Sequence, residues 1–287
     1  MAERLADLAA QIEGVRQLDS VVSAMRGIAA SRAQSGRALL PGIDAHARVV
    51  SRAIGAALNL SPPDGASTER DRSAGRGLIV FCAEQGFVGA FSERVLDRVA
   101  GEPPGTTILL IGTRGDALAR ERGMAPAWTS PMASNANAVP GLAGRLADAL
   151  YERISEDGLA SVDVVYSRMA DGSGIAIERR SLLPLDYRQF QRPIERRTPL
   201  TNLAPAILIQ RLAAEYIYAQ LCRAAMQAFE AENEARMLAM GSAHINIQRK
   251  LEDLGHLERR LRQQEITAEV LELATGAEAA ARDRDAR

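Results

Sequence analysis

The sequence predicts an α/β protein in which the two ends of the chain form a long antiparallel coiled coil that carries a small inserted doubly wound (Rossmann-like) domain. Three observations predict this. The C-terminal part repeats apolar residues at alternating three- and four-residue steps, with no proline after Pro205. The N-terminal part keeps the same spacing, which is typical of helices that pair along a narrow seam. Between them, short apolar runs alternate with amphipathic segments, as strands and helices of a small parallel or mixed sheet do.

The first helix is expected over residues 1–60. Its seam residues recur at heptad spacing: Leu5, Leu8, Ile12, Val15, Val22, Met25 and Ala29. The pair Pro41-Gly42 is expected to kink or break it, because proline removes a helical hydrogen bond and clashes with the preceding turn. Residues 61–77 are rich in turn-forming and polar residues and are expected to form a linker.

An α/β domain is expected over residues 78–184, followed by a linker over 185–202. Its predicted strands are Leu78–Cys82, Thr106–Ile111, Val162–Ser167 and Gly174–Leu183. Its predicted helices are Ser92–Val99, Asp116–Arg122 and Gly141–Asp157, and residues 124–140 are expected to be irregular. Strands that alternate with helices favour a doubly wound sheet.

The second coiled-coil helix is expected over residues 203–287, with its heptad pattern running from about Leu203 to about Gly276. Thr201 or Asn202 is expected to cap it, and Pro205 is tolerated in the first turn. At 1.5 Å per residue, about 70 residues form a rod on the order of 100 Å long. One modest domain cannot bury such a rod.

Composition narrows the functional classes. The net charge is -1 with 25% charged residues, which gives no bias toward nucleic acid or an anionic membrane. The two cysteines, Cys82 and Cys222, are far apart and indicate a reducing compartment without a disulfide framework. We expect no signal peptide, and the apolar runs are too short to span a bilayer.

The candidate sites for chemistry are weak. The loop over residues 85–90 carries Gly86 and Gly89 between a strand and a helix, where backbone amides could hold phosphate. It lacks a G-x-G-x-x-G fingerprint and a phosphate-binding lysine, so a tight turn is the favoured interpretation. The histidines share no metal-ligand spacing: His46, His244 and His256. We therefore predict no catalytic, cofactor-binding or metal-binding residues.

Both termini carry motifs in a defined order. The C-terminal matches are Glu234-Ala235-Arg236-Met237, Ala239-Met240, Arg262-Gln263, Ile266-Thr267 and Glu269. With the N-terminal run IEGVRQLDSVVSAMRGIAASR, the chain resembles the gamma subunit of F-type ATP synthases over its whole length. It departs from the usual family pattern at His244-Ile245-Asn246, Gln264-Glu265 and Arg32.

The resemblance implies a non-catalytic central stalk subunit. Such a shaft rotates and couples ion translocation, of H⁺ or Na⁺, to ATP synthesis or hydrolysis by other subunits. The implied partners are the alpha and beta subunits of the catalytic ring, the epsilon subunit and the c-subunit ring. The implied location is peripheral, at the cytoplasmic face of the bacterial inner membrane or an equivalent membrane, with contact to lipid only through other subunits. The alternative is a nucleotide-binding α/β enzyme that is dimerised by its coiled coil, and a generic coiled-coil scaffold is a third interpretation.

The resemblance also implies residue roles. Contact with partners and coupling fall to Met25, Arg236, Arg262, Gln263, Thr267 and Glu269. The tip inside the catalytic ring carries Ile266, Val270 and Leu273. Placing Met25 beside 236–240 sets an antiparallel register in which paired numbers add to about 263, so Ile12 meets Leu251. In that register residues beyond Glu265 have no partner helix in this chain.

Overall fold

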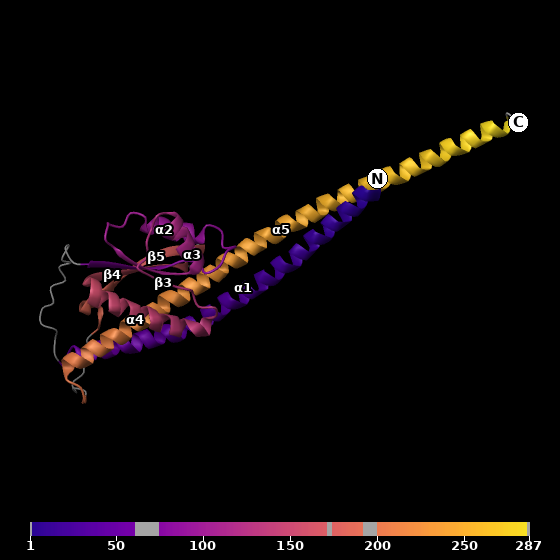
Figure 1. The fold of residues 1–287 in the computed structure, drawn as a ribbon. Helices are drawn as coiled ribbons and strands as arrows, with labels where there is room; N and C mark the ends of the chain where they lie inside the picture. Colours follow the sequence, from indigo (N-terminus) through magenta and orange to yellow (C-terminus); the bar gives the residue numbers. More distant parts are fainter. Residues whose placement is uncertain (1, 61–74, 171–173, 192–199, 286–287) are drawn as a thin grey trace. The chain divides into compact units, whose positions relative to one another are not determined.

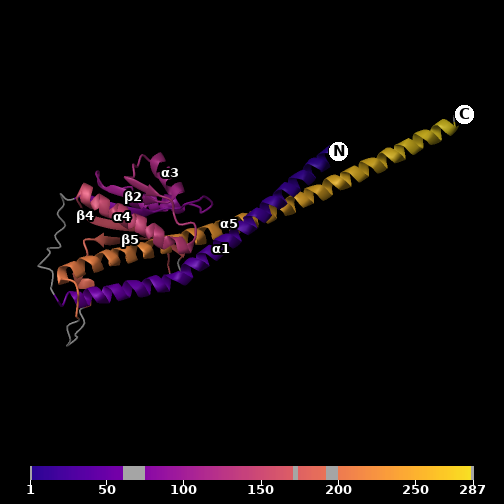
Figure 2. The same cartoon turned by 60° about the horizontal axis from the view of Figure 1, so that its bottom comes forward.

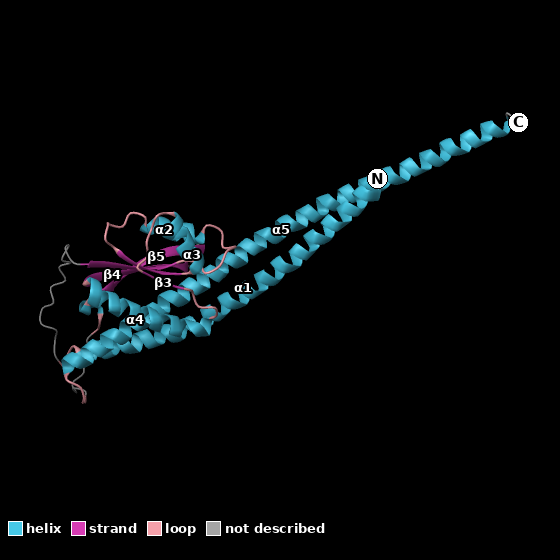
Figure 3. Cartoon of the chain, in the orientation of Figure 1, coloured by secondary structure: helices cyan, strands magenta, loops and turns pink. Residues whose placement is uncertain are grey.

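The computed structural model of the protein describes residues 2–60, 75–170, 174–191 and 200–285. It contains two long helices and a five-stranded sheet (Figures 1 and 3). The chain divides into two compact units, one formed by Met1–Gly27 with Leu238–Arg287 and the other by Ile28–Met237. The predicted α/β fold class, with long N- and C-terminal helices, is confirmed.

Helix α1 spans Ala2–Ala57 without interruption and contains Pro41, so of the kink or break expected there, the break does not occur. Pro41 and Gly42 are both exposed. The carbonyl group that a proline leaves without its helical partner can therefore be solvated, which makes the proline tolerable inside the helix. Both ends of the chain contribute to the first compact unit, and the later part of α1 belongs to the second.

Helix α5 spans Pro205–Asp285, so it begins later than Leu203 and its first residue is the proline. The Leu208 amide donates to the Ala204 carbonyl at 3.0 Å, which marks the first turn. Thr201 and Asn202 therefore lie too early to cap the helix. The Thr201 hydroxyl instead donates to the carbonyl of Leu203 at 3.1 Å and stabilises the turn before it.

In the first unit, α1 and α5 pair in the predicted antiparallel register. Leu8, Ile12 and Leu254 are buried together, with Leu251 packed against them. His244 Nδ1 lies 2.6 Å from Asp19 Oδ1, and Gln248 donates to Asp19 Oδ2 at 2.9 Å. The polar positions thus meet one another across the seam. Figures 1 and 2 show the N-terminus lying beside α5, which continues beyond it.

In the second unit, the strands are β1 (Gly75–Phe81), β2 (Thr107–Ile111), β3 (Trp128–Ser130), β4 (Leu159–Ala170) and β5 (Gly174–Leu183). Their order is β3-β2-β1-β4-β5, with β5 antiparallel to β4 and the other pairs parallel. Strand β3 lies in the segment expected to be irregular, because three residues are too few to show an alternating pattern. The other four strands were predicted.

The sheet is covered on both faces. On one face lie α2 (Phe91–Val99) and α3 (Thr113–Glu121), and on the other α4 (Val139–Asp157) and α5 (Figure 1). Alternate residues of β1 point to opposite faces of the sheet. Leu78 and Val80 are buried with residues of α2 and α3, whereas Ile79 and Phe81 are buried with residues of α4 and α5. This three-layer arrangement is the predicted doubly wound architecture.

The sequence suggested boundaries between the two long helices and the sheet domain. The two compact units do not follow those boundaries. Ile217, Leu221 and Phe229 of α5 are buried in the same cluster as the sheet residues, so this part of the helix belongs to the sheet unit. The short helices η1 (Ala136–Ala138) and η2 (Tyr187–Gln189) complete the fold. Phe190, inside the expected 185–202 linker, is 3% exposed and packs among other apolar residues. Residues 61–74 and 192–199 of the two expected linkers lie outside the described residues.

Candidate functional site

Strands β1, β2 and β3 end at one edge of the sheet, the edge at which doubly wound proteins bind ligands. Here the carboxylate of Glu84, just after β1, occupies the backbone donors. Its Oε2 accepts from the amide of Thr113 at 3.0 Å and from that of Met132 at 2.8 Å, and its Oε1 accepts from the Thr113 hydroxyl at 2.9 Å. Thr113 is the first residue of α3, so this carboxylate sits where a helix N-terminus would otherwise receive an anion.

A second carboxylate reaches the same loop from α5. Glu232 Oε1 accepts from the amides of Glu84 at 3.1 Å and Gln85 at 3.4 Å. The Arg236 guanidinium lies 2.5 Å from the same oxygen, and the two side chains are only 6% and 4% exposed. Because the backbone amides of the loop donate to the Glu232 carboxylate of the helix, the Glu232–Arg236 pair attaches the β1–α2 loop to α5.

Arg236 makes the reciprocal contacts. Its guanidinium donates to the carbonyls of Gly86 and Gln85, both at 3.3 Å, and to the side-chain oxygen of Asn233 at 3.2 Å. Burial raises the pKa of Glu232, while Arg236 and the loop amides act in the opposite direction. The loop and the helix thus satisfy each other's buried polar groups, and the loss of one partner would leave a buried charge uncompensated.

This geometry favours the interpretation of residues 85–90 as a tight turn. Phe87 and Gly89 both have φ of 60°, and Phe87 is 67% exposed. A phosphate at this edge would compete with the carboxylates of Glu84 and Glu232, which already use the amides of the turn and of α3. The nucleotide-binding enzyme is therefore not favoured.

Two of the residues predicted to contact partner subunits, Arg236 and Met25, are buried or partly buried within this protein. Arg236 is 5% exposed and its hydrogen bonds are internal. Met25 is partly buried in the seam, where it packs with Val22 and Met240. A direct contact by Arg236 with another subunit would have to replace the bonds to the loop, so the structure places it as a clamp between α5 and residues 85–86.

The other predicted contact residues lie together on the exposed end of α5. Arg262, Gln263, Thr267 and Glu269 are all exposed. Arg262 pairs with Glu258 at 3.1 Å, and the Thr267 hydroxyl donates to the Gln263 carbonyl at 2.8 Å. These bonds are local to the helix, so both side chains present their remaining polar atoms to the surface.

The predicted apolar tip is exposed as well. Ile266, Val270 and Leu273 are 56%, 60% and 75% exposed. Their i, i+4, i+7 spacing places them on one face of the helix, and Leu271 beside them is 66% exposed. This stripe continues the pattern of the paired seam but has no covering helix among the described residues.

Sequence reasoning missed Glu232 as the partner of Arg236 and Glu84 as the acceptor for the Thr113 and Met132 amides. One signal was available: Glu230, Glu232 and Glu234 interrupt a stretch of α5 that is otherwise largely apolar. Glu230 and Glu234 face Arg37 of α1 at 2.8 and 3.7 Å. Charged residues in a buried helical stretch require partners.

Two further findings concern the described part of the chain. Across these residues there is no cluster of three or more histidine, cysteine or acidic side chains suited to a metal ion. None of the described helices is both long and apolar enough to cross a membrane.

Comparisons with known proteins agree with one another. A family model described as ATP synthase matches residues 4–280. The ATP synthase gamma chain of Clavibacter sepedonicus is 27% identical, covering 94% of this chain and 96% of its own length. That of a Nocardioides species is 26% identical, with 98% of each chain covered.

Solved structures show the same fold. A chain of the Euglena gracilis mitochondrial ATP synthase, in the structure titled OSCP/F1/c-ring in rotational state 3, is similar with a TM-score of 0.67. It is 16% identical, and the match covers 97% of this chain and 95% of that one. A chain from the central stalk and c-ring of the Tetrahymena thermophila enzyme is 14% identical, with a TM-score of 0.52, and the match covers 78% of this chain and 99% of that one.

Proposed function

We propose, from the premise that this chain belongs to the ATP synthase family as a gamma-type central stalk subunit, that it turns as a shaft inside a ring of alpha and beta subunits. Its rotation would couple ion translocation through a membrane ring to ATP synthesis or hydrolysis. The chain itself would catalyse no reaction, because the chemistry would belong to the surrounding subunits. The transported ion is H⁺ or Na⁺, a choice made by the ligands of the c subunits.

The exposed stripe of Ile266, Val270 and Leu273 carries this proposal. A lone helix gains nothing from an apolar face in water, and an exposed apolar stripe marks an interaction surface. Burying each such side chain is worth roughly 1.5–3 kcal/mol. A sleeve of other subunits around this end of α5 would supply that burial.

The polar residues near the stripe suit a bearing. Arg262, Gln263, Thr267 and Glu269 would form hydrogen bonds with the alpha and beta subunits that break and reform as the shaft turns. Arg236 would act from within as a positioning residue that holds the loop at residues 85–86. Met25 would maintain the register of the seam.

The remaining partners follow from the same premise. The epsilon subunit and the c-subunit ring would bind the sheet unit, and membrane contact would be made through them. The complex would lie at the cytoplasmic face of the bacterial inner membrane, or at an equivalent energy-transducing membrane. The chain would use neither nucleic acid nor a cofactor of its own.

Amide hydrogen exchange on the free chain and on the assembled complex tests the sleeve. In the free chain, amides 266–275 are expected to exchange within about tenfold of unstructured peptide, because local opening costs little where few contacts form. In the complex they are expected to exchange at least about a hundredfold more slowly. Amides 221–235 serve as the control and are expected to be protected in both. A tip that is equally protected in the free chain, or equally unprotected in the complex, would contradict the proposal.

A further inference from the structure

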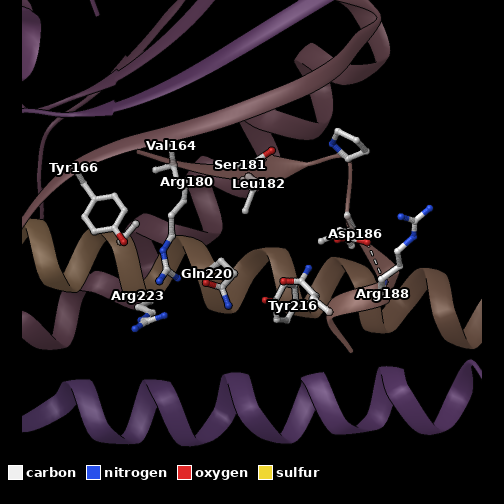
Figure 4. A pocket seen from close by; sticks show the side chains of 14 residues that line it. Val164, Tyr166, Arg180, Ser181, Leu182, Asp186, Arg188, Tyr216, Gln220 and Arg223 are labelled. Carbon is white, nitrogen blue, oxygen red and sulfur yellow. Dashed lines mark hydrogen bonds between the residues drawn. The ribbon is translucent and has the colours of Figure 1, made fainter. Parts of the chain in front are cut away.

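The second unit contains a cavity of about 620 Å³ between the sheet and α5. Its walls come from β4, β5, the segment after β5, and α5 (Figure 4). Figure 4 shows Tyr166 and Arg180 extending from the strands toward α5, which presents Tyr216, Gln220 and Arg223. Polar side chains from separate elements therefore converge on one space.

The charge around this cavity is predominantly positive. Arg180, Arg188 and Arg223 line it, whereas the one acidic lining residue is Asp186. Asp186 accepts a hydrogen bond from the Arg188 amide at 3.0 Å. The chain has only one lysine, Lys250, so the choice of arginine over lysine at these positions does not by itself indicate a ligand. What matters is that three guanidinium groups share one cavity.

The arginines are only partly neutralised. Arg180 shares the carboxylate of Glu178 with Arg168. Arg223 Nε lies 3.0 Å from Asp44 but is not aligned for a hydrogen bond. The side chain of Arg188 has no ion pair within the described residues. Donors therefore remain for a ligand.

The two phenols add neutral donors. Burial raises the pKa of Tyr166 to about 12 and also raises that of Tyr216, although Arg180 and Arg223 act in the opposite direction. Both hydroxyls therefore keep their protons at neutral pH. Guanidinium groups with neutral hydroxyls are a donor set that suits the oxygens of a phosphate group.

We propose that this cavity binds a small phosphate-bearing organic anion. The phosphate would lie between Arg180 and Tyr216, and the exposed Arg188 side chain, which Figure 4 shows extending away from these two, would turn inward to contact it. The organic part would contact the apolar wall that includes Val164, Leu182 and Pro184. The volume falls within the range of small-molecule sites, roughly 300–1,000 Å³, and a bare phosphate would leave much of it empty. This site is separate from the anion positions that Glu84 and Glu232 fill, and it adds a ligand to the shaft function.

Bound anion would join three parts of the unit. Arg180 belongs to β5, Arg188 to η2 and Tyr216 to α5, so one phosphate would connect the segment after β5 to the helix. The occupied cavity would stabilise the attachment of residues 184–189 to α5. Amides in that segment would exchange more slowly when ligand is present.

Calorimetric titration of the full chain tests this site, with inorganic pyrophosphate and ADP as probes in the absence of Mg²⁺. We expect saturable 1:1 binding of both, tighter for ADP because of the apolar wall. Arg188→Gln and Tyr216→Phe should each weaken binding by roughly tenfold or more, the loss expected for a hydrogen bond to a charged group. The matched control is Arg211→Gln, which removes the same charge from an exposed position of α5 outside the cavity, and its affinity should equal that of the wild type.

The variants should remain folded. Arg188 is exposed, and Tyr216→Phe retains the ring that packs edge-on against Phe190 at 5.0 Å between centroids. Equal weakening in Arg211→Gln would reveal non-specific charge attraction and overturn the proposal. So would binding that all variants keep, or the lack of binding of both probes at millimolar concentration. Such a failure leaves the shaft proposal intact, because the exchange experiment on residues 266–275 reads a different unit.

Discussion

Two stretches of the same helix, α5, have opposite environments. Most side chains over residues 221–236 are buried, including the charged Glu230, Glu232 and Arg236. The described side chains over 259–275 are exposed or partly exposed, including Ile266 and Leu273. The first stretch is covered by the sheet, by α4 and by α1, so even its charges must find partners. The second keeps an apolar stripe without a covering element, which is the pattern of a surface prepared for another protein.

The largest effect is expected where a buried charge loses its partner. Arg236→Met removes the guanidinium and leaves Glu232 buried with only backbone amides. We expect the free energy of unfolding of the sheet unit to fall by roughly 3–5 kcal/mol, as for other broken buried pairs. Urea titration followed by the fluorescence of the single tryptophan, Trp128, measures this, because Trp128 lies in β3 of the same unit.

Arg211→Met is the matched control for that measurement. Arg211 is exposed on α5, in the same unit, and its loss should change stability by less than about 0.5 kcal/mol. If the two substitutions destabilise the protein equally, the buried stretch does not depend on its ion pair. The contrast between paired charges at 221–236 and solvated charges elsewhere would then be wrong.

The reactivity of cysteine thiols is a second test of the difference between the buried stretch 221–236 and the exposed stretch 259–275. Cys222 lies in the buried stretch, and burial raises its pKa; burial also raises the pKa of Cys82 to about 12 from 9.0. A raised pKa reduces the thiolate fraction at a given pH, so at pH 8 Cys82 carries roughly a thousandth of the thiolate of an ordinary thiol. Neither cysteine should react with a disulfide reagent at pH 8 until urea unfolds the protein.

A cysteine at the tip provides the comparison. In Val270→Cys the new side chain replaces one that is 60% exposed, so one thiol per chain should react at the rate of a small-molecule thiol. Rapid reaction of Cys222 in the native protein would show that residues 221–236 open readily. Slow reaction at position 270 would show that the tip is covered within the free chain.

The features predictable from sequence are those repeated along the helices. Heptad spacing predicted that the two helices pair, and the family resemblance set the register by placing Met25 beside residues 236–240. The structure places Asp19 against His244, as that register requires. The same spacing indicated the exposed stripe at the tip. Strand β3 was missed because its three residues are too few to show an alternating apolar pattern. The Arg236 clamp was missed because its acceptors, the carbonyls of Gly86 and Gln85, lie 150 and 151 residues away in the chain, and no local pattern reports such proximity.

The smallest effect on the free chain is expected at Arg262. Its side chain is 66% exposed and pairs with Glu258 four residues earlier. Exposed pairs of this kind contribute roughly 0.3–0.5 kcal/mol, so Arg262→Ala should leave the thermal unfolding of the helix, followed by circular dichroism, almost unchanged. If the tip is a bearing, the same substitution should weaken binding to the alpha and beta subunits by roughly fivefold to a hundredfold, because a charge-assisted hydrogen bond across an interface is worth more than an exposed pair. Arg249→Ala, at an exposed position of the same helix, controls for the loss of charge. A variant that loses stability but keeps its affinity for the other subunits would mean that Arg262 serves its own helix rather than the ring.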